Sequence, residues 1–104
     1  DWAIPSGIQA KMWGIKAGPW MKPHLEAKGI MDPSDQRNII KDLLLRFDTM
    51  VSEIAQADNV VHVKVQGTLS DSEWNDEIHP SRDGFERVAG LFRDQLAVQF
   101  PGTF

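Results

Sequence analysis

The 104-residue sequence contains no cysteine. It can therefore form no disulfide, bind no metal through a thiolate and use no cysteine nucleophile. Proteins without cysteine occur on both sides of a membrane, so this absence does not indicate the cellular compartment. The sequence also has no excess of positive charge, since its net charge is −4 and its pI is about 5.2. This balance argues against nucleic acid or an anionic membrane surface as a partner.

Long apolar runs are missing as well. The longest, such as Leu43-Leu44-Leu45, are far shorter than the ~20 residues of a membrane-spanning helix, so we expect no membrane span. The fractions of hydrophobic and charged residues, 41% and 25%, are close to those of average globular domains. The length fits one small domain.

Hydrophobic periodicity predicts two long amphipathic helices. The first covers residues 33–57, with Asp32 able to cap it and Pro33 at its first position. Apolar residues recur at helical spacing from Ile39 to Ile54, and we expect this stripe to be core. The second long helix covers residues 81–98.

The other segments are shorter or irregular. Residues 1–18 show no periodicity and are interrupted by proline and glycine, so we expect a loop. A short helix is expected over residues 19–28. Residues 59–65 are mostly β-branched and predict a strand, with His62 in a core or an interface.

One strand alone is a structural problem. A strand must give its N–H and C=O groups to neighbours, and a strand between amphipathic helices is typical of a parallel α/β sheet. The remaining strands are missing from this sequence. A short strand near residues 1–15, other chains, or an absent N-terminal half of the domain would have to supply them.

The segment Trp74-Asn75-Asp76-Glu77-Ile78-His79-Pro80-Ser81 lies between the predicted strand and the last helix, where active-site loops lie in α/β proteins. Asp76 and His79 are three residues apart. The carboxylate can accept a hydrogen bond from the imidazole Nδ1–H, which leaves Nε2 free to take a proton from a hydroxyl nucleophile. The alternative is an ordinary turn, with Asp76 capping it and His79 flanking the helix.

This segment resembles the Asp-x-x-His-Pro block that precedes the last helix of SGNH (GDSL-type) serine hydrolases. Trp74 before the block and Gly84-Phe85 after it resemble one branch of that family. Upstream, Asp1-Trp2-Ala3-Ile4-Pro5 and Gly18-Pro19-Trp20 look like loops that follow the family's central strand. The resemblance covers essentially the whole chain.

The resemblance implies the C-terminal part of a three-layer α/β/α, flavodoxin-like fold with a parallel sheet. Residues 1–104 would then be a single partial domain, with a loop over 1–18 and helices plus the last strand over 19–104. The absence of a methionine at position 1 fits a partial domain.

The resemblance also implies an esterase, lipase or acetylesterase acting on a small-molecule, glycan or lipid ester. His79 would be the general base and Asp76 its partner, while Trp2, Trp20 and Trp74 would contact the substrate. The family's Gly-Asp-Ser nucleophile block, its Gly block and its Gly-x-Asn-Asp block are missing. We therefore expect the isolated chain to be inactive, and to self-associate or to need a missing N-terminal half. The alternative is a small non-enzymatic α/β interaction module that self-associates.

No cofactor or metal is expected. No two of the three histidines have the spacing of metal ligands. The acidic run over residues 71–77 partly matches an EF-hand loop, but Asp76 and Arg82 stand where that loop needs Gly and Glu. A solvated acidic loop is the simpler interpretation of this run.

Overall fold

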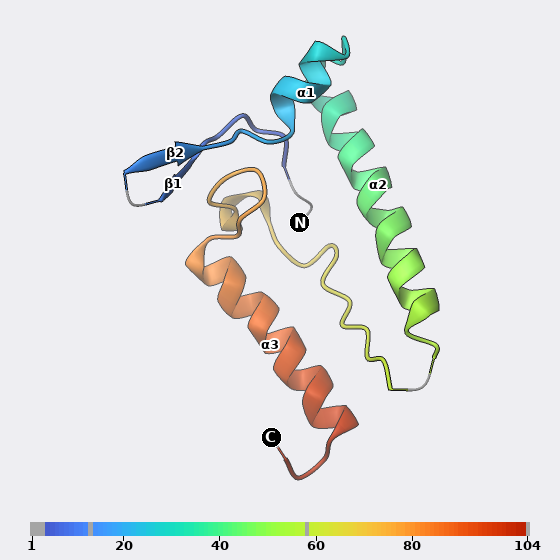
Figure 1. The fold of residues 1–104 in the computed structure, drawn as a ribbon. Helices are drawn as coiled ribbons and strands as arrows, with labels where there is room; N and C mark the ends of the chain where they lie inside the picture. The colour runs from blue at the N-terminus through green and yellow to red at the C-terminus, as the bar shows by residue number, and fades with distance from the viewer. Residues whose placement is uncertain (1–3, 13, 58, 104) are drawn as a thin grey trace.

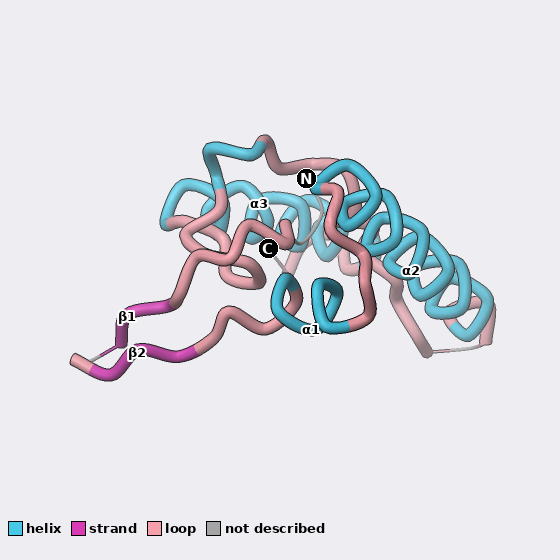
Figure 2. Tube along the Cα trace, turned by 90° about the horizontal axis from the view of Figure 1, so that it is seen from above, coloured by secondary structure: helices cyan, strands magenta, loops and turns pink. Residues whose placement is uncertain are grey.

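The computed structural model describes residues 4–12, 14–57 and 59–103. In chain order, its elements are strands β1 (Ala10–Met12) and β2 (Ile15–Ala17), helices α1 (Lys22–Ala27) and α2 (Pro33–Ile54), the 3-10 turn η1 (Asp71–Glu73) and helix α3 (Arg82–Gln99). The chain between α2 and η1 runs in an extended path between the two long helices (Figure 1). The hairpin of β1 and β2 projects away from the helices (Figure 2).

The structure confirms the two long helices predicted from periodicity, α2 and α3, and the short helix α1. The Asp32 carboxylate accepts the N–H groups of Ser34 and Asp35 at 2.8 and 3.0 Å, so it caps α2 as expected. The hydroxyl of Ser81 caps α3 by accepting the N–H of Gly84 at 3.2 Å. Helix α1 is shorter than the expected range of 19–28. Within the described ranges, no helix combines the length and the apolarity that crossing a membrane requires.

The loop expected over residues 1–18 contains a β-hairpin instead. Strand β1 pairs with β2 in antiparallel register, with Ala10 opposite Ala17. Gly14 lies in the turn with a φ of +78°, a conformation that glycine adopts without strain. Strands of three residues are too short to leave a periodic pattern. The sequence also allows a short strand near residues 1–15 as a partner for residues 59–65, but β1 pairs with β2 instead.

The prediction of a three-layer α/β/α fold with a parallel sheet is wrong. The described residues are mostly helical, and their only sheet is the two-stranded antiparallel hairpin. Residues 60–65, most of the predicted strand, are extended but form no β-ladder. Their β-branched side chains favour an extended backbone, but a strand also requires a neighbouring backbone, and the described part of the chain offers none.

The expected core along α2 is largely exposed. Phe47, Met50 and Ile54 keep 55%, 47% and 56% of their surface accessible. Among the described residues, the buried apolar side chains are Pro5, Ala10 and Leu69. The radius of gyration of 16.1 Å also exceeds the value of about 13 Å expected for a compact chain of this length. The long helices therefore present apolar faces that this chain does not cover.

Candidate functional site

Asp76 and His79 form a hydrogen-bonded pair in the loop between η1 and α3. The Nδ1 atom of His79 lies 2.9 Å from Oδ2 and 3.0 Å from Oδ1 of Asp76. The Oδ1 atom also accepts the backbone N–H groups of Ile78 at 3.0 Å and of His79 at 2.9 Å. This pair can form because the two residues are close in the sequence, and an aspartate side chain readily accepts the N–H groups of residues two and three positions ahead. The structure thus brings together the two residues that the sequence singled out.

The backbone holds the two ends of this loop together. The N–H of Asn75 donates to the carbonyl of His79 at 2.8 Å, and the N–H of Ser81 donates to the carbonyl of Glu73 at 2.7 Å. A Cβ atom on Gly84 would lie 2.6 Å from the same Glu73 carbonyl oxygen. Only glycine at this position allows α3 to begin so close to the loop.

The two members of the pair differ in their exposure. The Asp76 side chain is almost completely buried, while 41% of the His79 side chain is exposed. Burial raises the pKa of Asp76, but hydrogen bonds from the N–H groups of Ile78 and His79 and from the His79 ring outweigh it, so the pKa lies below its usual range. The ionised carboxylate only accepts hydrogen bonds, so Nδ1 carries the proton. No hydrogen bond occupies Nε2 within the described part of the chain.

Glu77 is a functional candidate that the sequence reasoning missed. Its side chain is fully buried, and its Oε1 atom accepts the N–H groups of Gly7 at 2.9 Å and Lys22 at 3.1 Å. Its Oε2 atom accepts those of Trp20 at 2.5 Å and Met21 at 2.6 Å. One carboxylate therefore ties both ends of the hairpin segment to the Asp76–His79 loop.

This tie places Trp20 against His79. Their ring centroids are 5.4 Å apart, and the rings meet edge to face at 74°. Trp74 forms an isolated antiparallel bridge with Pro80, and its indole Nε1 is buried with no hydrogen-bond partner in the ranges described. Trp2 lies outside the described residues. Of the two predicted substrate-contacting tryptophans that the structure describes, Trp20 is the one whose ring packs on His79.

The acidic run is only in part the solvated loop that the sequence suggested, because Asp71, Ser72 and Asn75 are exposed while its last two residues are not. Asp76 and Glu77 are both buried. Asp71 makes a two-pronged ion pair with Arg37, whose hydrogen bonds lower the pKa of that carboxyl. Glu73 accepts the backbone N–H of Ser70, which is the main reason why its pKa is lowered. Across the described ranges, no group of three or more His, Asp or Glu side chains could hold a metal ion.

Comparisons with protein families, with curated proteins and with solved structures find no match for this chain. Functional interpretation therefore depends on the residues of the loop and on their geometry.

Proposed function

We propose that this chain supplies the general-base histidine and its aspartate partner to an SGNH-like serine ester hydrolase. The observation that carries the proposal is the Asp76–His79 pair, in which a buried carboxylate holds Nδ1 while the ring remains partly exposed. A histidine held in this way can take a proton from an attacking hydroxyl through Nε2 and return it to the leaving alcohol. The carboxylate of Asp76 would stabilise the imidazolium that forms in between.

The substrate that we propose is a carboxylic ester of a small molecule, a glycan or a lipid. Trp20 supports this proposal because its ring packs on His79, where it can contact the apolar part of a substrate. Trp2 and Trp74 remain candidates for the same role.

The nucleophile has to come from another polypeptide segment. None of the serines in this chain lies in a Gly-Asp-Ser sequence. Because the loss of any triad member leaves only residual catalysis, the isolated chain should hydrolyse no ester at a useful rate.

A second candidate is a non-enzymatic interaction module that self-associates. The exposed apolar residues of α2 favour it, as does the extended chain at residues 60–65, which forms no β-ladder with the described residues. Under either proposal a protein surface covers the apolar helix faces, either a second copy or the polypeptide that carries the serine.

The test of catalysis uses the tagged chain purified from its source cells together with the polypeptides that bind it. A fluorophosphonate, which reacts with activated serines, should label a serine in the sample, and p-nitrophenyl acetate should be hydrolysed. Both signals should fall about 10³-fold or more with His79→Ala. They should be unchanged with His24→Ala, which alters an exposed histidine in α1.

Two results would contradict the proposal. One is a sample without labelling, or with labelling that His79→Ala leaves intact. The other is clear hydrolysis by the isolated chain, which would show that no second segment is needed.

A further inference from the structure

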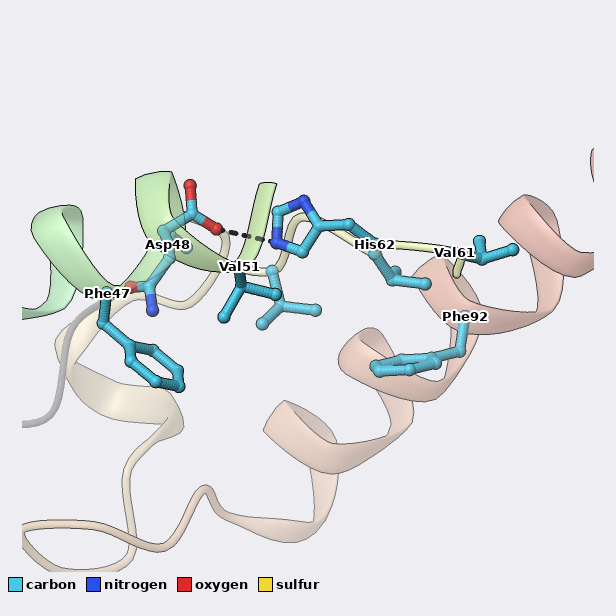
Figure 3. Close-up of a pocket in the computed structure, with 9 residues that line it drawn as sticks. Phe47, Asp48, Val51, Val61, His62 and Phe92 are labelled. Carbon is cyan, nitrogen blue, oxygen red and sulfur yellow. Dashed lines mark ion pairs between the residues drawn. The ribbon is translucent and has the colours of Figure 1, made fainter. Parts of the chain in front are cut away.

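A groove of about 280 Å³ lies between α2, α3 and the extended segment of residues 60–65. Figure 3 shows the side chains of Phe47 and Val51 from α2 and of Phe92 from α3 pointing into this space. The extended segment contributes three alternate valines, which are Val61, Val63 and Val65. The groove is therefore mainly apolar.

The groove has one polar pair. The Nε2 atom of His62 lies 3.0 Å from Oδ1 of Asp48, and the two side chains are only 17% and 13% exposed. The pair fixes the extended segment to α2 through its middle residue. Lys64, on the same alternating side of the segment as His62, is exposed and makes no ion pair with the described residues.

Most of the backbone of this segment has no partner among the described residues, and the exception is the carbonyl of Val65, which accepts the hydroxyl of Thr68 at 2.8 Å. From Val60 to Lys64, no N–H or C=O group is hydrogen-bonded to another group in the described part of the chain. An extended, β-branched stretch with unpaired N–H and C=O groups is the surface to which another strand adds.

The exposed area indicates how large the covering surface must be. A folded chain of 11.7 kDa should expose about 5,900 Å², whereas this chain exposes 7380 Å². The excess is about 1,500 Å², so two copies could bury about 3,000 Å² together, within the range of obligate homodimers.

We infer that a second copy of this chain covers the groove, and that the two extended segments pair in antiparallel register about a two-fold axis at Val63. This register places Val61 opposite Val65 of the copy and Val63 opposite itself. It also places Lys64 opposite His62 of the copy, next to the carboxylate of Asp48, so the charges are complementary. The inference rests on the proposal that a protein surface covers the helix faces, and it is independent of the catalytic role of His79.

Sedimentation of the full chain tests the assembly. We expect a species of twice 11.7 kDa that dissociates only on dilution. Val61→Lys puts a charge into the groove and should raise the dimer dissociation constant about 100-fold or more, since it acts once in each copy. Val98→Lys is the matched control. Val98 is 73% exposed and lies on another side of α3 from Phe92, so this change should leave the constant within about threefold.

A cross-link tests the register without destabilising the fold. The chain has no cysteine, so Val63→Cys carries a single thiol. Residues opposite each other in a non-hydrogen-bonded antiparallel pair have Cβ atoms about 4.5 Å apart, which a disulfide can span. Mild oxidation should therefore give a covalent dimer with Val63→Cys and little with Val98→Cys.

A chain that stays monomeric at all concentrations would overturn the inference and leave another polypeptide as the cover. So would equal effects of the two lysine variants, or equal cross-linking of the two cysteine variants. None of these results bears on the fluorophosphonate experiment, so the two proposals can fail separately.

Discussion

Glutamine in place of Glu77 is the most direct test of how the candidate site is held together. Each oxygen of the Glu77 carboxylate accepts two backbone N–H groups, and the side chain is fully buried. Glutamine has the same shape but only one acceptor oxygen. Whichever way its amide is turned, two N–H groups lose their acceptor and face an NH₂ group.

The magnitude follows from the number of lost bonds. A hydrogen bond to a charged group contributes about 1.5–3 kcal/mol, so losing two should lower the free energy of unfolding by about 3–6 kcal/mol. A protein of this length has a total of about 5–15 kcal/mol. Glu77→Gln should therefore remove a large part of the stability of the chain.

Urea denaturation measures the total effect, and amide hydrogen exchange shows where it occurs. The N–H groups of residues 20–22 should be protected in the natural chain and should exchange much faster in Glu77→Gln. The control is Glu86→Gln, which alters an exposed glutamate on α3 that pairs with Arg82. This change should barely move the urea midpoint. Equal midpoints for the two variants, or unchanged protection of residues 20–22, would refute the role given to Glu77.

Three further predictions concern the loop and helix α3, which follows it. Asp76→Asn should move the proton of the neutral His79 ring from Nδ1 to Nε2, because the amide NH₂ of asparagine would face Nδ1. Imidazole ¹⁵N chemical shifts report the tautomer, and an unchanged tautomer would contradict the prediction. Because the pKa of Asp76 is lowered in the folded chain, the contribution of its carboxylate to the free energy of unfolding should be complete above about pH 5 and be lost as the pH falls below about 3.9. The difference in stability between the natural chain and Asp76→Asn should therefore shrink in acid, and a constant difference would contradict this. Gly84→Ala should destabilise the chain by about 1–3 kcal/mol through its clash with the Glu73 carbonyl. Gly90→Ala, in the same helix with nothing within 4 Å, should stabilise it by about 0.5–1 kcal/mol, and thermal melts that rank the two variants equally would refute the packing argument.

The sequence was sufficient wherever the structure depends on residues that are close together in the chain. Helix α2 follows from the Asp32 cap and the apolar spacing, and the Asp76–His79 contact follows from a three-residue separation. In each case the interacting groups lie within one or two turns of chain, so the pattern of residues specifies the geometry.

The sequence was not sufficient where a distant or external partner decides the outcome. The valines of residues 60–65 specify an extended backbone, but pairing depends on a strand that the described residues do not provide. Glu77 lies in an acidic run that reads as solvated, and nothing local shows that its oxygens accept amides from residues 7 and 20–22. The stripe on α2 specifies an apolar face without specifying what covers it.

The bonds of Glu77 also determine when the candidate site can form during folding. The Asp76–His79 pair closes a loop of three residues and can form as soon as this segment exists. The contact between Glu77 and Gly7 spans 70 residues, and closing so long a loop is entropically costly and slow. Trp20, which packs on His79, is held by its own hydrogen bond to Glu77 across 57 residues. During synthesis, both contacts must wait until residues 76–79 have left the ribosome. The Asp76–His79 pair then closes across three residues, whereas the contacts of Glu77 must bring residues 7 and 20–22 back across 55 to 70 residues of chain.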